Sequence, residues 1–159
     1  MRDWLRSGGQ DGVAIDLLVR GSCSLRPGVP GLSERIRAVS IIDRFLEHAR
    51  VYHFQNDGEP ETLLASGDLM QRNLDHRVEV AFPLVDPIVA AQVLELLELQ
   101  LHDTTKGRVL GPDGGVLRRG LDENWPPLRS QSRTYEHGLM ASGLKAATLK
   151  FPDSWDPEL

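Results

Sequence analysis

Phe45-Leu-Glu-His-Ala-Arg-Val-Tyr-His-Phe54 is the stretch around which the chain is organised. Its second half alternates as a β-strand does, and successive side chains of a strand point to opposite faces. His48, at the start of this strand, and Arg50 therefore share one face. An imidazole exchanges a proton near pH 7, and a guanidinium group holds phosphate oxygens with two parallel hydrogen bonds. The pair suits phosphate chemistry, although a His-x-Arg on a strand is more often an ordinary solvated face.

The segments on either side of this stretch predict an α/β domain. Ile15–Val19 is mostly apolar and of strand length, which is typical of a strand buried on both sides. Arg20 follows at the carboxyl end of that strand, the edge where ligands of open α/β sheets gather, so it is a candidate anion-binding residue. Arg50–Phe54 and Thr62–Ala65 are predicted to pair as a hairpin, because Asn56–Pro60 between them has the composition of a tight turn.

The clearest helical pattern begins at Pro87 and ends at Leu101. Asp86 can cap its first turn, and proline suits the first helical position. Apolar residues recur there at helical spacing and are predicted to pack against the sheet: Val89, Val93, Leu96, Leu97 and Leu101. Arg77–Phe82, just before this helix, is predicted as a strand, whereas Ile36–Ile42 is apolar enough for either a strand or a helix.

The remaining segments are less regular. Residues 2–10 predict a short helix that Gly8-Gly9 ends, and residues 21–33 hold so much glycine and proline that they must form a loop. Long loops in compact domains are often functional. Ser66–Asp75 is a polar connection with room for one helical turn.

The chain changes character beyond Lys106. Gly111–Gly115 is predicted as a turn between two short strands, Arg108–Leu110 and Val116–Arg118. A helical stretch is predicted around Ser130–Met140, after Pro126-Pro127. Residues 141–159 show no period and are expected to lie on the surface or to be disordered.

Composition limits the protein class. The 159 residues, 40% of them hydrophobic, suffice for one domain with a real core, and a single cysteine, Cys23, excludes an internal disulfide framework. The chain has no run of membrane-span length and its start has no apolar signal core, so we expect a cytoplasmic protein. The net charge of −5 argues against nucleic acid as a general partner. A local basic site remains open, because 15 of the 18 basic residues are arginine, which is suited to binding phosphate.

Common catalytic motifs are missing, with one exception. The sequence has no glycine-rich phosphate loop, no zinc-ligand spacing and no Gly-x-Ser-x-Gly motif. His48 and the small-residue turn Ser66-Gly67, followed by Asn73, are similar to phospholipase D-type sites, in which a strand carries His-x-Lys. Arg50 replaces that lysine.

Three longer segments resemble the carboxyl-terminal catalytic domain of the type 1 polyphosphate kinase family. They are residues 18–33, 41–52 and 66–80, in the family's order, and the similarity covers about residues 13–110. Two positions depart from the family pattern: Gly67, usually alanine, and Leu69, usually tryptophan. Both departures concern packing more than chemistry.

The resemblance implies a fold and a domain division. The fold is one phospholipase D-like half, α/β with a mixed sheet flanked by helices. Residues 1–110 would form the kinase domain, truncated at its amino end, and residues 111–159 a divergent, partly irregular extension. The phosphorylated histidine and the Mg²⁺ ligands belong to the preceding half in this family, so no metal site is expected in this chain.

The resemblance also implies an activity and roles for named residues. The family reversibly transfers the terminal phosphate of ATP to inorganic polyphosphate through a phosphohistidine. Membrane association as part of a larger complex is the alternative to a purely cytoplasmic location for this chain. Arg20 would contact the ATP phosphates, and His48 would be the second active-site histidine, donating a proton to the leaving oxygen. Arg50 could hold a neighbouring phosphate. Further polyphosphate-binding candidates are Arg37, Arg44 and Arg72, with Asp43, Glu47 and Glu79 as structural partners of these arginines.

Three functions remain open. The chain could act in a kinase together with the missing domains, being inactive alone. It could be a phospholipase D-like phosphodiesterase that works as a homodimer. It could also be a module that binds polyphosphate or nucleotide without turnover.

Overall fold

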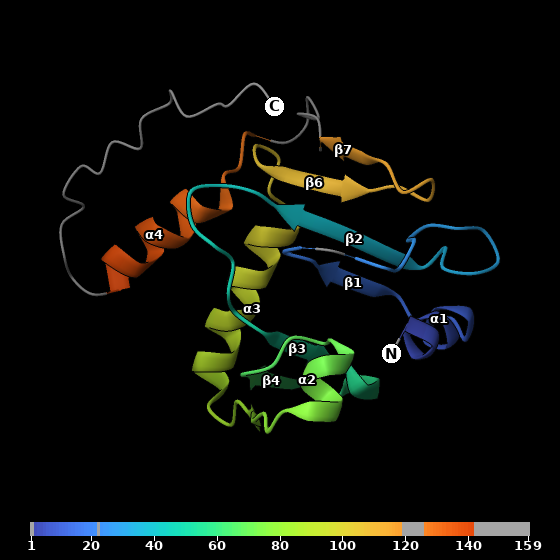
Figure 1. Cartoon of the computed structure of the whole chain (residues 1–159). Helices are drawn as coiled ribbons and strands as arrows, with labels where there is room; N and C mark the ends of the chain where they lie inside the picture. The colour runs from blue at the N-terminus through green and yellow to red at the C-terminus, as the bar shows by residue number, and fades with distance from the viewer. Residues whose placement is uncertain (1, 22, 119–125, 142–159) are drawn as a thin grey trace.

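A computed structural model describes residues 2–21, 23–118 and 126–141 of the chain (Figure 1). One sheet has four strands in the order β1-β2-β6-β7. These strands are β1 (Ile15–Leu18), β2 (Ile36–Ile41), β6 (Gly107–Leu110) and β7 (Val116–Arg118). β1 runs parallel to β2, whereas β2 with β6 and β6 with β7 are antiparallel, so the predicted mixed sheet is confirmed.

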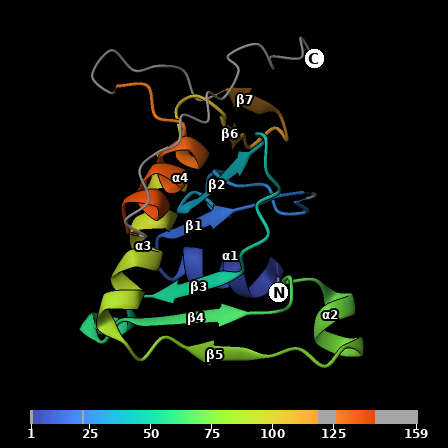
Figure 2. The same ribbon diagram turned by 90° about the vertical axis from the view of Figure 1, so that its left-hand side faces the viewer.

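A second, antiparallel sheet has the order β3-β4-β5 and lies below the first (Figure 2). Its strands are β3 (Val51–Phe54), β4 (Glu61–Ala65) and β5 (Ala81–Pro83). The predicted hairpin is confirmed, and its turn contains a 3-10 turn, η1 (Asn56–Gly58). Asn56, Asp57 and Gly58 all have positive φ, a conformation that Asn, Asp and Gly tolerate best. The two candidate residues of the opening stretch precede β3 rather than lie within it.

The strand predicted at Arg77–Phe82 is wrong in its bounds, since only β5 is a strand there. Residues 78–80 instead run beside Ser66. The Ser66 N–H donates to the Val80 carbonyl at 2.9 Å, and the Val80 N–H donates to Ser66 Oγ at 2.9 Å. The serine side chain takes the place of a ladder acceptor, so regular pairing begins only at Ala81.

Four helices accompany the sheets: α1 (Arg2–Gln10), α2 (Gln71–His76), α3 (Pro87–Leu101) and α4 (Ser130–Ala141). α3 confirms the predicted cap, because Asp86 Oδ1 accepts from the N–H groups of Ile88 and Val89 at 2.8 and 3.3 Å. The prediction that Gly8-Gly9 ends the first helix is wrong, since α1 continues through both glycines. A Cβ at Gly9 would lie 3.3 Å from the Ile36 side chain, so the glycine allows close packing of α1 on β2.

The core centres on β2. The buried apolar residues are Leu25, Ile36, Ala38, Val39 and Ile41. The segment that could have been a strand or a helix is thus the most buried strand described. β1 is less buried than predicted, because it is an edge strand of its sheet and exposes Asp16, which bonds to Arg37 on β2 at 2.6 Å.

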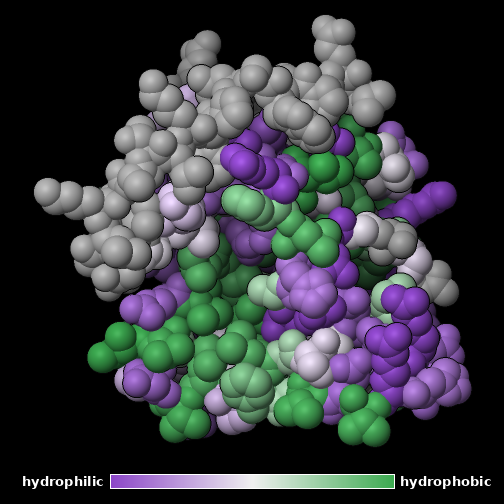
Figure 3. All heavy atoms as spheres, turned by 60° about the vertical axis from the view of Figure 1, so that its left-hand side comes forward, coloured by the Kyte–Doolittle hydropathy of each residue, from purple (hydrophilic) through white to green (hydrophobic). Residues whose placement is uncertain are grey.

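The apolar stripe of α3 is only half-buried. α3 runs beside both sheets and contacts β1 and α4 (Figures 1 and 2). Val89 is nevertheless 41% exposed, and the rest of the predicted stripe is intermediate. Apolar side chains gather on the lower part of the surface in Figure 3. Exposed members near α3 and the second sheet include Phe54, Leu74, Val78, Val80, Phe82, Val85 and Ile88. No helix in the described part of the chain combines the length and apolar character that a bilayer crossing needs.

The carboxyl-terminal part is joined to the first sheet. The predicted β6–β7 hairpin and the predicted helix α4 are confirmed, and the sheet continues across residue 110 through the pairing of β6 with β7. The expectation for residues 142–159 lies outside the described residues.

Candidate functional site

Side chains from three separate segments meet at one carboxylate, that of Asp68. Arg20, just after β1, places Nη2 at 3.6 Å from Asp68 Oδ2. Arg50, just before β3, places Nε at 2.9 Å from Asp68 Oδ1. His48 lies against Arg50, so the structure brings together the three principal site residues predicted from the sequence.

His48 and Arg50 touch through their side chains. Arg50 Nη1 lies 3.0 Å from His48 Nδ1, and Nη2 lies 3.2 Å from Nε2. A guanidinium group has only donors, so the ring nitrogen that accepts is one without a proton. Arg50 Nη1 also donates to the His48 carbonyl at 3.1 Å, which ties the guanidinium to the backbone of the same residue. The two side chains are adjacent as predicted, but the prediction that a strand carries them is wrong, because β3 begins at Val51.

Asp68 is held in its charged form. The hydrogen bond from Arg50 lowers its pKa most; burial acts in the opposite direction, and the charges of Arg50, Arg20 and His48 add to the lowering. The side chains of Arg20, Arg50 and Asp68 are 33%, 17% and 29% exposed, so the cluster is open to solvent on one side. Both guanidinium groups are therefore partly exposed to solvent.

Two side chains hydrogen-bond to the backbone of the loop that carries Asp68. The Tyr52 hydroxyl donates to the Gly67 carbonyl at 3.1 Å, and Asn73 Nδ2 donates to the Asp68 carbonyl at 3.1 Å. Burial raises the pKa of Tyr52, and the charge of Asp68 raises it further, while Arg50 acts against them. Tyr52 thus remains a hydroxyl donor at neutral pH. Asn73 is 3% exposed, so water competes little for its hydrogen bond to the loop.

Gly67 occupies a crowded position. A Cβ there would lie 2.9 Å from both Cγ and Cδ of Glu79. The Glu79 side chain therefore uses the space that an alanine would fill, and its carboxylate accepts from Ser66 Oγ at 2.5 Å. Alanine, the usual residue of the family at this position, would therefore require the Glu79 side chain to move.

The other arginine candidates are not joined to this cluster. Arg37 lies near the start of β2, at the opposite end of the β1–β2 pair from Arg20. Its guanidinium group forms an ion pair with Asp16. The Arg44 guanidinium lies over the Phe45 ring, 5.7 Å from its centroid. Arg72 is exposed on α2, and no hydrogen bond within the described residues links it to Asp68.

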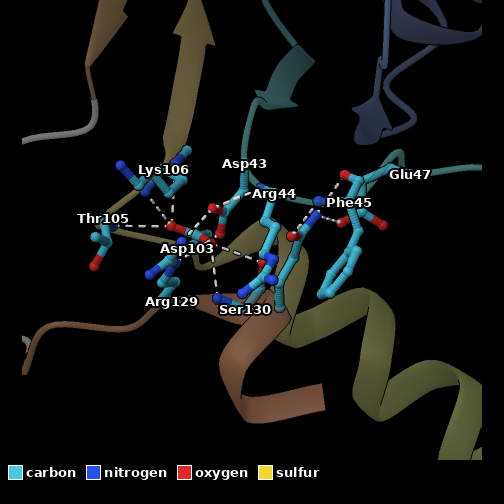
Figure 4. Close-up of polar contacts among 11 residues, drawn as sticks. Asp43, Arg44, Phe45, Glu47, Asp103, Thr105, Lys106, Arg129 and Ser130 are labelled. Carbon is cyan, nitrogen blue, oxygen red and sulfur yellow. Dashed lines mark hydrogen bonds and ion pairs between the residues drawn. The ribbon is translucent and has the colours of Figure 1, made fainter. Parts of the chain in front are cut away.

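Two of the predicted acidic partners make structural contacts, and Asp43 also accepts from the N–H of an expected arginine, Arg44, at 2.8 Å. Asp43 binds Arg129, through Oδ2 to Nε at 2.8 Å and Oδ1 to Nη2 at 2.5 Å. Glu47 binds Gln100 and Gln131, each at 2.6 Å (Figure 4 shows this region). The structure therefore ties the segment before His48 to α3 and to the start of α4.

The contact between Asp43 and Arg129 makes the stability of the fold depend on pH. Burial raises its pKa, but the hydrogen bonds from Arg129 and the Arg44 N–H, with the charges of Arg129 and Lys106, outweigh burial and bring it below the usual value of 3.8. A carboxyl whose pKa is lowered by folding contributes stability above its unfolded pKa and loses it as the pH falls through the folded value. We expect Asp43→Asn to unfold at lower urea than the unchanged chain at pH 7, and the difference to shrink below about pH 4. A difference that stays constant between pH 7 and pH 3 would contradict this.

Two groups of site residues were not predicted. Asp68 could have been found from the hairpin, because the Ala65 N–H donates to the Arg50 carbonyl at 2.9 Å, and Asp68 follows three residues later. For Arg129 and Gln131 the sequence offered a faint resemblance of residues 127–131 to the family but no sign of their contacts, since their partners lie 84 to 86 residues away. Within the described residues, no group of three or more His, Cys, Asp or Glu side chains could hold a metal ion.

A family comparison gives this geometry a context. The model of the family described as polyphosphate kinase C-terminal domain 2 matches residues 1–131. That match includes all the residues of the cluster and also Arg129 and Gln131.

Curated relatives and one solved structure agree with the family match. The chain is 52% identical over 122 residues to polyphosphate kinase 1 of Chlorobaculum tepidum, covering 77% of this chain and 17% of the relative. It is 48% identical over 137 residues to polyphosphate kinase of Escherichia coli K12, covering 85% and 20%. The crystal structure of polyphosphate kinase from Porphyromonas gingivalis superposes with a TM-score of 0.84 at 33% identity, covering 89% of this chain and 22% of that one. The chain thus spans about a fifth of the length of these relatives.

Proposed function

Since the chain belongs to the polyphosphate kinase family, we propose that it supplies the second half of a kinase site for reversible phosphate transfer between ATP and inorganic polyphosphate. Arg20, His48 and Arg50 are the residues of this half-site. The observation that carries the proposal is their convergence around Asp68, with Arg20 and Arg50 both beside one carboxylate. Guanidinium groups that pair with a carboxylate also pair with phosphate oxygens, so a phosphate group would bind here beside Asp68 or in exchange for its contacts with the two arginines.

Phosphoryl transfer depends mainly on positioning and on stabilising charge that builds up on the phosphate oxygens. In our proposal Arg20 binds the phosphates of ATP, and Arg50 binds a neighbouring phosphate. A phosphate is a stronger acceptor for Arg50 than a neutral imidazole is, so phosphate binding would draw Arg50 away from the His48 ring. The freed ring nitrogen could then take up a proton and give it to the leaving oxygen.

The rest of the reaction belongs outside this site. The phosphohistidine and Mg²⁺ that the family uses would come from other parts of the kinase. Mg²⁺ would neutralise phosphate charge there. The partners proposed for this chain are therefore ATP or ADP, polyphosphate and the other kinase domains.

Binding of inorganic tripolyphosphate by the purified chain tests the phosphate site directly. We expect binding that weakens with salt, and a loss of about tenfold or more in Arg20→Ala. A hydrogen bond to a charged group contributes about 1.5–3 kcal/mol, and about 1.4 kcal/mol changes an affinity tenfold. Titration calorimetry gives the affinity, with Arg133→Ala as the matched control, because Arg133 is exposed on α4 and pairs with Glu136.

The outcomes separate the candidate functions. Equal affinities for Arg20→Ala and Arg133→Ala would contradict a phosphate site at Arg20. Hydrolysis of a phosphodiester by the chain alone, abolished by His48→Ala, would select the phospholipase D-like alternative. Binding that His48→Ala leaves unchanged, without activity in any kinase context, would select the module without turnover.

A further inference from the structure

We propose that Arg129 and Gln131 are positioning residues of the phosphate site, acting through residues 43–47. Together their side chains are called the clasp. The clasp would fix the positions of the His48 and Arg20 side chains by holding residues 43–47, which directly precede His48 and accept a hydrogen bond from Arg20. This inference rests on the proposed function for its catalytic meaning, but the positioning itself can be measured without kinase activity.

Residues 42–50 need an external support. They lie outside helices and strands, and the pairing of the second sheet reaches them at the Arg50 carbonyl, which accepts from the Ala65 N–H at 2.9 Å. Burial does not hold them, since the large apolar side chains Ile42, Phe45 and Leu46 are 55%, 53% and 70% exposed. Polar contacts to other segments are what remains to fix this stretch.

Gln131 uses both ends of its amide on this segment. Its Oε1 accepts from the Phe45 N–H at 2.9 Å, and its Nε2 donates to the Phe45 carbonyl at 2.7 Å and to Glu47 Oε1 at 2.6 Å. Gln131 is 7% exposed, so water competes little for these bonds. The other Glu47 oxygen accepts from Gln100 on α3 at 2.6 Å, which fixes Glu47 from two sides.

Arg129 holds the same segment two residues earlier. It makes a two-pronged contact with Asp43, whose side chain is 2% exposed. A planar fork of this kind fixes orientation as well as distance, which a lysine cannot do. The residue between the clasp residues is Ser130, and its N–H and Oγ bond to buried Asp103 at 2.8 and 2.7 Å. Asp103 therefore holds the backbone between the two clasp residues in place (Figure 4).

The clasp reaches the phosphate site through Glu47. Glu47 directly precedes His48, and its carbonyl accepts from Arg20 Nη1 at 3.3 Å. A shift of residues 45–47 would therefore move the histidine ring and also release a backbone acceptor of Arg20. Both principal residues of the proposed site depend on the same short segment.

The test follows the His48 ring signals by NMR in the purified chain without ligand. Gln131→Met keeps the length of the side chain but removes its hydrogen bonds, and Arg129→Lys keeps the charge but not the fork. We expect both to shift the His48 ring signals, while Arg133→Lys, on the exposed part of α4, leaves them unchanged. His48 signals that stay in place in both clasp variants, with the fold intact by circular dichroism, would overturn the proposal.

Exchanging the amide of Gln131 and the carboxylate of Glu47 gives a second test, in which tripolyphosphate binding is measured. Gln131→Glu places a carboxylate against Glu47 and should weaken tripolyphosphate binding at least about threefold. Adding Glu47→Gln restores a donor to that pair, although not to the Phe45 carbonyl, so the double variant should regain part of the affinity and move the His48 signals back toward their original positions. No recovery of either quantity would count against positioning through Glu47. A chain that binds no tripolyphosphate would refute the proposed function, whereas the His48 signals would still decide the role of the clasp.

Discussion

Asp103→Ala is expected to lower the free energy of unfolding by about 3–5 kcal/mol, because it removes an acceptor from five donors in a buried place. The Asp103 side chain has no solvent exposure. Its Oδ1 accepts from the N–H groups of Thr105, Lys106 and Gly107 at 2.9, 2.6 and 3.1 Å. Its Oδ2 accepts from the N–H and hydroxyl of Ser130 at 2.8 and 2.7 Å.

This loss is large relative to the whole fold. A domain of ordinary size has a stability of about 5–15 kcal/mol, so the variant should be close to unfolding at 37 °C. Urea unfolding followed by circular dichroism measures the change. Asp113→Ala is the matched control, since Asp113 caps an exposed turn with one bond of 2.8 Å to the Gly115 N–H, and we expect a loss of about 1 kcal/mol there. Similar losses in the two variants would show that the Asp103 network does not stabilise the fold as described.

His48→Ala is expected to lower kcat by a factor of about 10²–10⁴ in an active kinase, the usual range for a group that transfers a proton in the transition state. The experiment replaces the matching segment of the Escherichia coli kinase, which is 48% identical, with this chain and follows polyphosphate formation from ATP. The His48 side chain is exposed, so the free energy of unfolding should change little.

The control for this variant is His76→Ala. His76 is another exposed histidine, at the end of α2, and it should leave kcat within about twofold of the unchanged chimera. If His48→Ala also stayed within about threefold of the unchanged chimera, His48 would not be the proton donor. A rise in KM with kcat unchanged would make His48 a binding residue instead.

Elements with local determinants could be predicted from the sequence. The cap of α3 lies within three residues of its donors, and the turn of the β3–β4 hairpin lies between the strands it joins. The β6–β7 hairpin and α4 follow from patterns of the same short range, whereas the mixed sheet was expected from the family resemblance.

Predictions that depended on neighbours in space were less accurate. β1 was expected to be buried on both sides, but burial depends on whether a further strand pairs beyond it. The strand before α3 was expected to start at Arg77, but a serine side chain from another segment takes up its first hydrogen bonds. β2 could not be assigned at all, because an apolar run of that length fits a buried strand or a buried helix.

The sequence by itself determined the family resemblance and the choice of Arg20, His48 and Arg50, since residue types and their spacing are written in the chain. Only the tertiary structure decided that Asp68 joins the two arginines, that Arg37 is occupied elsewhere, and that the clasp holds the segment before His48. The reason is the range of the interactions: the clasp contacts join residues 84 to 86 positions apart. Bonds of that range leave no periodic pattern in either segment, and the packing of α3 and α4 brings the partners together.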